Sequence, residues 1–414
     1  GRFYRLPNEQ DLSAVRKAAN ELEKRLDANI GTSGMIPNEP LPPHGTLGFR
    51  VQLYGMSAWC DLFSPRQNLT LITLCEKLKS AGKQLEAEYP NGLGRAVQEV
   101  LALNIDKIAD YGSSLASWSS PASQETVRNT FGRQALPIIW DFAEAYPFAS
   151  SSGGWSHNLD YLMSPLKAES LSFLIGGTSS RSNAIQNPLS DDSADAFITD
   201  PPYYDAIPYA DLSDFFFVWL KRSIDLHSSV GNNLQLTPKD DECVVDLIKG
   251  HDRLFFENMM TKALEEGRRV ARPSGIGVIV FAHKSTAGWE AQIKALIDAG
   301  WIVTGSWPID TERTGRMRAN ASAALASSVH LVCRPRESID GLISTDDIGY
   351  WSDVLTELPQ RIHAWLPGLA AQGVVGADAI FSCLGPALEI YSRYSRVEKA
   401  SGEVVTLKEY LEEV

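Results

Sequence analysis

Residues 195–204 (DAFITDPPYY) place an acid, two prolines and two tyrosines directly after a short apolar run. The run of Ala196, Phe197 and Ile198 has no polar alternation, which is typical of a strand in a parallel sheet covered on both faces. Proline cannot continue a central strand, so Asp-Pro-Pro is also an ordinary way to end one. However, the carboxyl end of such a strand is where open α/β sheets bind ligands. A hydrogen-bond acceptor, a rigid carbonyl and flat rings at that place suit a planar base with an exocyclic amine.

The residues Asp200, Pro201, Pro202 and Tyr203 match the catalytic motif of DNA amino-methyltransferases. An exocyclic amine is a poor nucleophile because its lone pair is delocalised into the ring. If the Asp200 carboxylate and the Pro201 carbonyl, held rigid by the prolines, accept the amine hydrogens, the nitrogen moves toward sp3 geometry. Its lone pair can then attack the methyl group of S-adenosylmethionine. We expect Tyr203 to stack on the target base after it has been flipped from the duplex.

Longer segments of the sequence resemble adenine-specific DNA methylases that contain a zinc ribbon. The segments that carry this resemblance cover nearly the whole chain: LGFRVQLYGMSAWCDLFSPRQ, VRNTFGRQALPIIWDFAEAYPF with SSSGGW, TDPPYYDAIPYADLSDFFFVWLKR, GWIVTGSWPIDTE, NASAALASSVHLVCRPR and LGPALEIYSRYSRV. The resemblance implies an S-adenosylmethionine-dependent enzyme that methylates adenine in double-stranded DNA. Within the family, Asp rather than Ser before Pro-Pro goes with adenine rather than cytosine.

Two features of that family are missing from this sequence. Family members carry an upstream Asp-Pro-Phe-x-Gly-x-Gly type loop, which holds the methionine part of the cofactor, and the cysteines of the ribbon. The glycine pair in 173–180 lies too close to Asp200 for the intervening β-α-β units, and 381–386 lacks the glycine spacing. The five cysteines form no Cys-x-x-Cys pair, so no metal site is predicted. We therefore expect the C-terminal part of the family architecture, completed by an N-terminal segment or a partner subunit that carries the glycine loop.

This expectation has a structural consequence for the motif strand. In the methyltransferase sheet, that strand neighbours the one that carries the glycine loop. Without this neighbour, residues 196–199 would form an exposed apolar edge, and such edges invite pairing with another chain.

The remaining cofactor contacts are assigned to Asn183, Asp200 and Tyr204. The segment 181–189 (RSNAIQNPL) aligns with the loop that contacts the adenine ring of the cofactor in such enzymes, and Asn183 stands where a polar side chain is expected. A plain surface loop is the alternative interpretation of this segment.

Two groups of arginines are candidates for contacts with DNA phosphates. In a chain with a net charge of −13, a local basic cluster beside the active face indicates phosphate binding, although a solvated loop is the alternative. The first group lies in the loop 311–320 and comprises Arg313, Arg316 and Arg318. The second extends the same groove and comprises Arg128 and Arg133, with Phe131 and Gln134 beside them.

The periodicity along the chain predicts an α/β protein with an N-terminal, mainly helical domain. Residues 8–29 and most of 64–147 have helical spacing, and 47–55 alternate like a strand. Further on, apolar runs alternate with helical patterns, which predicts a largely parallel, doubly wound sheet of the Rossmann-like class I methyltransferase type. The strands are expected at 195–200, 277–282, 301–307 and 329–333, and the helices at 212–222, 254–271 and 289–299. The expected domains are a recognition or assembly domain (1–158), a partial catalytic domain (159–336) and a mixed, mainly helical tail (337–414).

The composition is that of an ordinary globular protein. Hydrophobic residues make up 44% and charged residues 21% of the 414 residues. No apolar run approaches the roughly 20 residues of a membrane span, and no signal peptide is visible. Scattered cysteines favour a reduced compartment, so we expect a cytoplasmic protein without membrane contact.

Two other functions remain open at this point. A catalytically silent, methyltransferase-like DNA-binding or scaffold subunit of a modification or phage-defence complex would explain the missing glycine loop and the acidic charge. Methylation of RNA or of a protein side-chain amide uses the same four-residue motif. The retained Asp-Pro-Pro-Tyr favours an active DNA enzyme over the silent subunit.

Overall fold

The computed structural model describes residues 4–27, 34–120, 125–170, 176–202, 204, 207–225, 234–281, 286–309, 328–337, 347–372 and 377–414. The chain is an α/β protein that divides into two compact units. Unit 1 comprises residues 1–179 and 207–242, and unit 2 comprises 180–206 and 243–414. The polypeptide therefore enters unit 2 at the motif strand, returns to unit 1, and then completes unit 2.

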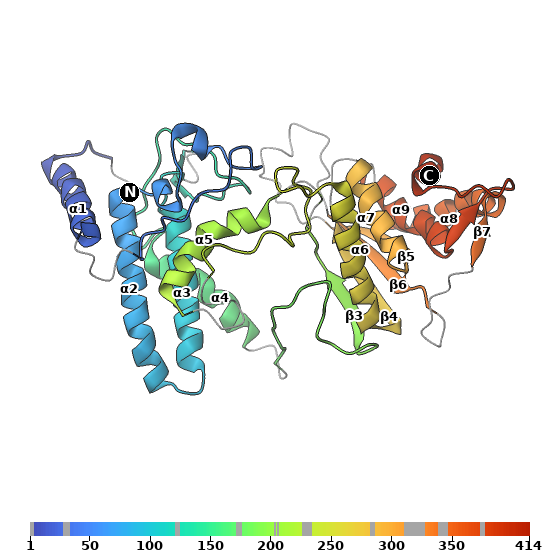
Figure 1. The fold of residues 1–414 in the computed structure, drawn as a ribbon, viewed down its shortest axis with the longest axis horizontal. Coiled ribbons are helices and arrows are strands. Elements are labelled where there is room, and N and C mark those ends of the chain that lie inside the picture. Colours follow the sequence, from blue (N-terminus) through green and yellow to red (C-terminus); the bar gives the residue numbers. More distant parts are fainter. Residues whose placement is uncertain are drawn as a thin grey trace. The chain divides into compact units, whose positions relative to one another are not determined.

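Unit 1 is built mainly from helices, of which α2 and α3 lie side by side (Figure 1). Ser64 caps α2 in a capping box with Gln67, and Pro65 occupies the first helical position, where its missing N–H costs nothing. The core is aromatic: the ring of Phe63 meets Trp219 edge-to-face at 5.3 Å. The helices are α1 (Glu9–Asp27), α2 (Pro65–Glu88), α3 (Leu93–Tyr111), α4 (Trp155–Glu169) and α5 (Tyr209–Ser223), with short 3-10 helices η1 (Val51–Tyr54) and η2 (Trp59–Leu62) and strands β1 (Ser117–Ser119) and β2 (Thr126–Arg128).

Helix α5 packs in unit 1, although the sequence places it in the expected catalytic domain. Its apolar face carries the fully buried Phe215 and Trp219, which join the aromatic core around Phe63. The run of phenylalanines that follows the motif therefore packs in the core of unit 1 and is not available as a platform for a base.

Two segments of unit 1 differ from the secondary structure that their sequence predicts. Residues 47–55 form a bridge and the helix η1, because only Phe49 and Val51 turn inward whereas Leu53 is 71% exposed. The expected helix over 132–148 is absent, and this stretch is irregular. Pro137 removes a backbone donor from it, and the Leu136 N–H bonds the Gly48 carbonyl at 2.8 Å instead.

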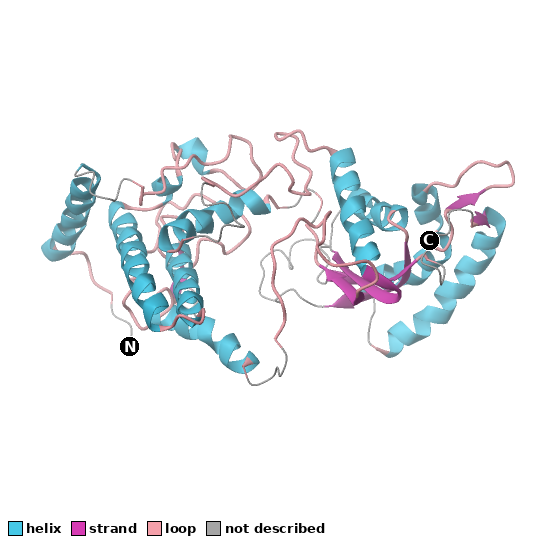
Figure 2. Ribbon diagram, turned by 60° about the horizontal axis from the view of Figure 1, so that its bottom comes forward, coloured by secondary structure: helices cyan, strands magenta, loops and turns pink. Residues whose placement is uncertain are grey.

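Unit 2 holds the mixed sheet, which Figure 2 shows as the magenta strands gathered among helices. Its described elements are β3 (Ala194–Thr199), α6 (Arg253–Val270), β4 (Ala271–Phe281), α7 (Thr286–Asp298), β5 (Trp301–Ile309), β6 (Ser328–Pro335), β7 (Ile348–Tyr350), α8 (Trp351–Ala371), α9 (Ala377–Ser392), β8 (Arg396–Glu398) and α10 (Leu407–Glu413). The predicted strands and helices of this region are confirmed to within a few residues, except that β4 begins six residues earlier than expected.

The four-stranded sheet has the order β3-β4-β6-β5. Strand β3 runs parallel to β4, with Ile198 opposite Val278. Strand β6 runs antiparallel to both β4 and β5. The prediction of a largely parallel sheet is therefore confirmed only in part: β3, β4 and β5 share one direction, but the sheet is mixed because β6 runs in reverse between β4 and β5. An apolar run has the same composition in either direction, so the periodicity did not distinguish the two arrangements.

One face of this sheet forms the core of unit 2 and is covered by α6 and α7. Phe197 stacks on Trp301 with ring centroids 6.0 Å apart, and the Trp301 indole N–H donates to the Leu264 carbonyl of α6 at 3.0 Å. Gly267 and Gly277 leave room for these two rings, since a Cβ at either position would collide with an aromatic ring. Motif strand β3 is thus fixed to α6 through Phe197.

Among the described residues, no helix has both the length and the apolar character that a bilayer crossing requires.

Candidate active site

The motif begins at the carboxyl end of β3. Asp200 follows the last strand residue and is exposed, whereas Pro201 is buried and Pro202 is half-buried. Within the described residues, neither the Asp200 carboxylate nor the Pro201 carbonyl receives a hydrogen bond. The structure therefore presents two unoccupied acceptors on consecutive residues, next to a proline ring that is fixed in the fold.

The backbone turns sharply at Tyr204, which has φ of +25°. A bulky residue seldom adopts a positive φ, and such strain persists only where surrounding contacts enforce it. Those contacts are present: the Tyr204 carbonyl accepts from the Val245 N–H at 2.8 Å, and its ring meets Phe256 edge-to-face at 5.2 Å. Strained backbone is concentrated at functional sites, which makes this turn a candidate site on structural grounds alone.

The first turn of α6 supplies the support for this strained turn. Asp252 caps the helix by accepting the Phe255 N–H at 2.8 Å, and Phe256 in the same turn packs against Tyr204. Because α6 leads directly into β4, its N-terminus lies at the carboxyl edge of the parallel pair, beside Asp200. Sequence reasoning missed Val245 and Phe256, and the only available signal was the capping Asp252 before an aromatic pair.

Tyr204 itself packs on the core of unit 2. Its ring is therefore an anchor for the motif, and its predicted contact with the cofactor stays a prediction. Tyr203, the expected stacking ring, lies outside the described residues, as do Arg313, Arg316 and Arg318.

Asn183 lies on an exposed loop that precedes β3. Its side-chain oxygen accepts the Ile185 N–H at 3.1 Å in a local turn. Four residues later, the Asn187 N–H donates to Glu266 at 2.7 Å near the last turn of α6, which is the end of the helix opposite to Asp200. The structure does not join Asn183 to Asp200 by any hydrogen bond among the described residues, and the predicted cofactor role of Asn183 stays a prediction.

Strand β3 is an edge strand within the described part of the chain. It pairs with β4 alone, as expected for the motif strand without a neighbour. The expectation of a strand covered on both faces was wrong: Phe197 faces α6, but Ala196 and Ile198 are exposed, the latter by 70%. An apolar edge of this kind is a pairing surface.

Arg128 and Arg133 are exposed side chains of unit 1 that flank an anchored loop. The Asp110 carboxylate of α3 accepts from Asn129 at 2.8 Å and from the Phe131 N–H at 3.1 Å. Burial raises the pKa of Asp110, although both hydrogen bonds oppose that rise. Phe131 packs on Phe215 and is a core anchor rather than a groove residue, and the predicted phosphate contacts of Arg128 and Arg133 stay predictions.

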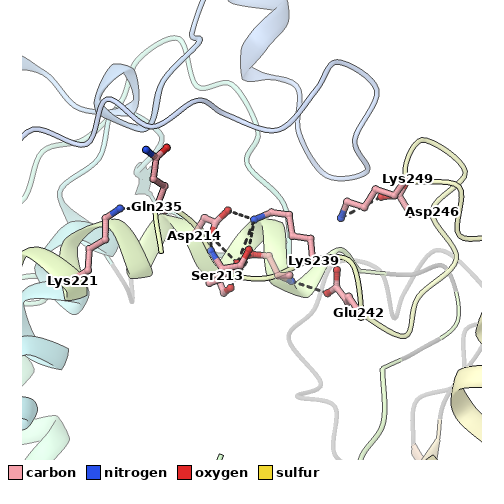
Figure 3. Close-up of polar contacts among 10 residues, drawn as sticks. Ser213, Asp214, Lys221, Gln235, Lys239, Glu242, Asp246 and Lys249 are labelled. Atoms are coloured by element: carbon pink, nitrogen blue, oxygen red, sulfur yellow. Dashed lines mark hydrogen bonds and ion pairs between the residues drawn. The ribbon is translucent and has the colours of Figure 1, made fainter. Parts of the chain in front are cut away.

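Asp214 of α5 is a second buried acid that the sequence left without a role. It accepts from the Thr237 N–H at 2.8 Å, from the Thr237 hydroxyl at 2.7 Å and from the Lys239 ammonium at 2.7 Å (Figure 3). These bonds fasten the segment after α5 to the helix. The carboxylate is fully satisfied by them and is structural.

A cavity of unit 1 is lined by a buried ion-pair cluster. Glu39 contacts Lys221 at 2.5 Å and Arg222 at 3.0 Å, and Lys79 lies on the same wall. Because these charges pair with one another, the cluster is a structural device rather than a free catalytic group. Among the described residues, no group of His, Cys, Asp or Glu side chains is arranged to hold a metal ion.

Comparison with protein-family models found no match, and comparisons with curated proteins and with solved structures found none either.

Proposed function

We propose that this chain is the catalytic half of an S-adenosylmethionine-dependent DNA methyltransferase that acts on the exocyclic amine of adenine. The observation that carries the proposal is the pair of acceptors at Asp200 and Pro201, which are free within the described chain and are held at the carboxyl end of a parallel strand by a strained turn. That edge is where α/β sheets bind ligands.

In this mechanism the protein's own residues position the amine. The Asp200 carboxylate and the Pro201 carbonyl accept its two hydrogens, which localises the nitrogen lone pair. The buried Pro201 ring and the Tyr204–Phe256 contact keep both acceptors in place, so that little reorganisation is needed during the reaction. S-adenosylmethionine, when bound, supplies the methyl group. Asp200 and Tyr204 are the residues of the motif region to which the family resemblance assigns contacts with it, and Tyr203 is the expected stacking ring for the flipped base.

The open edge of β3 supports the second half of the proposal. A strand that carries the glycine loop would pair with β3, and a layer from the same segment or partner subunit would cover Ile198. The same observation favours the alternative of a catalytically silent scaffold subunit, because no described segment beside β3 is placed to hold the cofactor's methionine part.

The deciding experiment is transfer of tritium from methyl-labelled S-adenosylmethionine to duplex DNA, with RNA and protein acceptors in parallel. The protein is isolated from its own host, so that a bound subunit is retained. Asp200→Ala removes the carboxylate, and Asp195→Ala removes another exposed carboxylate, which pairs with Arg272 near the other end of β3.

We expect labelled N6-methyladenine with the wild type and Asp195→Ala, and a loss of about 10²–10³-fold with Asp200→Ala, comparable to the loss of one preorganised hydrogen-bonding group in other enzymes. Transfer that is unaffected by Asp200→Ala would overturn the assigned role. No transfer to any acceptor would favour the silent scaffold.

A further inference from the structure

Unit 1 exposes large apolar side chains on two segments, 44–55 and 128–140. Trp140, with 81% of its surface exposed, is the most exposed aromatic residue of the described chain. Its ring meets Tyr54 edge-to-face, with centroids 5.7 Å apart and an interplanar angle of 90°. Leu53, beside Tyr54, is 71% exposed. Exposed apolar groups that contact one another, as Tyr54 and Trp140 do, are typical of binding surfaces.

The two segments are joined to each other by backbone contacts of residues that are buried in the core of unit 1. The Leu136 N–H donates to the Gly48 carbonyl at 2.8 Å, and Phe49 bridges to Leu136. Phe49 is 5% exposed and Leu136 is fully buried. Gly48 has φ of +82°, a conformation that glycine adopts without strain. The backbone of the two segments is therefore anchored to the core of unit 1 close to the exposed rings.

The charge of these segments is opposite to that of the whole chain. Segments 44–55 and 128–140 contain three arginines and no Asp or Glu, whereas the chain has a net charge of −13. Arg50, Arg128 and Arg133 are exposed and form no ion pair among the described residues. A carboxylate follows only at Asp141, after Trp140. Unpaired arginines on the same two segments as the exposed rings suit a polyanion with flat bases.

We propose that this surface, formed by Arg50, Leu53, Tyr54, Arg128, Arg133 and Trp140 and called the Trp140 surface below, binds nucleic acid. The rings stack on bases of an unpaired or opened strand, and the arginines contact phosphates. Interfaces between proteins also use Trp, Tyr and Arg, but the lack of acids and the unpaired cations favour a nucleic acid here. The inference rests on the proposed function, because DNA is the acceptor of that reaction and an opened strand accompanies base flipping.

The test measures binding of the full chain to fluorescent duplex and single-stranded DNA by anisotropy, over a series of salt concentrations. Trp140→Ala is compared with Tyr161→Ala, which removes another exposed ring from unit 1. Arg50→Ala/Arg133→Ala is compared with Arg16→Ala, which removes an exposed arginine from α1. All these side chains are exposed, so the variants are expected to fold.

We expect Trp140→Ala to weaken single-strand binding about tenfold, as for the loss of one stacked base. The arginine double variant should weaken binding to every sequence and lower the salt slope by about two, one for each phosphate that no longer meets an arginine. Both controls should bind like the wild type.

The inference is overturned if the wild-type chain binds no DNA. It is also overturned if Trp140→Ala and the arginine double variant bind DNA as tightly as the wild type. It is also overturned if Trp140→Ala loses a co-purifying protein and keeps its DNA affinity. Methyl transfer is measured separately: failure of transfer together with Trp140-dependent binding would remove the proposed function and leave this surface standing. Methyl transfer that depends on Asp200, together with unchanged DNA binding by Trp140→Ala, would support the proposed function and overturn the role of the Trp140 surface.

Discussion

Along one edge of the four-stranded sheet, helix α9 covers β5, whereas along the other edge β3 pairs only with β4 within the described residues. At the covered edge, the Val303 N–H donates to the Ser392 hydroxyl at 3.0 Å, and the Ser306 hydroxyl bonds the Ser382 carbonyl at 2.7 Å and accepts the Gly385 N–H at 2.9 Å. Helix α9 thus satisfies the Val303 N–H and the Ser306 hydroxyl of β5.

The open edge has no such partner in the described chain, and it carries the motif. Ile198 is 70% exposed one residue before the end of β3, and Asp200 follows the strand. Edge strands are usually protected by charges, prolines or a covering element, and β5 uses a covering helix. The difference indicates that α9 closes the edge at β5, whereas a further strand can pair with the edge at β3. This availability is why the proposed function places an additional segment or partner subunit on the β3 side.

Among the substitutions that test the two edges, Gly385→Ala at the covered edge is expected to lower the free energy of unfolding most. A Cβ at this position would collide with the backbone of Gly305 and Ser306, so α9 would have to move away from β5. We expect the free energy of unfolding to fall by about 3 kcal/mol, as for overpacking against a rigid neighbour. Gly368→Ala in α8 is the matched control, because nothing lies within 4 Å of its Cβ, and helix propensity should make it neutral or stabilising. Chemical denaturation of the full chain measures both, and equal stabilities would contradict the close approach of α9.

A smaller loss is expected from Ser392→Ala, which leaves the buried Val303 N–H without an acceptor. The cost of such an orphaned donor is about 2 kcal/mol. Hydrogen exchange followed by mass spectrometry should show faster exchange for the peptide that contains Val303. Ser395→Ala, which removes an exposed hydroxyl bonded to the Asp347 carbonyl, should leave that peptide unchanged. If the Val303 peptide exchanges equally fast in the wild type, the β5 edge is not sealed by α9.

The sequence predicted both edges only in part. The apolar runs of β4, β5 and β6 and the helices α6 and α7 were placed correctly, because short buried strands bounded by helical patterns are strong local signals. The reversed direction of β6 was missed, since direction depends on which neighbour a strand finds. Contacts of α9 with β5 likewise join residues far apart in the chain, such as Ser306 and Gly385.

The candidate site was likewise predicted from the sequence only in part. Asp200, Pro201 and Pro202 were predicted from a local motif, and their place at the end of β3 is confirmed. The strained backbone of Tyr204 was not predicted, because it depends on Val245 and Phe256, which no spacing rule connects to the motif. Trp140 was missed for the opposite reason: the stretch around it was assigned to a helix, and no pattern indicated that a tryptophan would stay exposed.

The smallest effect on stability is expected at the open edge, from Ile198→Lys. Because the side chain is already in water, the free energy of unfolding should change by no more than about 0.5 kcal/mol. A lysine on an edge strand opposes pairing with another chain, so light scattering should show less self-association of the variant at high protein concentration.

Ile279→Lys, on the covered face of the neighbouring strand β4, is the control and should prevent folding, because Ile279 is fully buried. A loss of more than about 2 kcal/mol in Ile198→Lys would mean that Ile198 is already covered in solution. In that case the edge at β3 would be covered, as the edge at β5 is by α9. The acceptor pair at Asp200 would then have no open sheet edge beside it with which a second segment could pair.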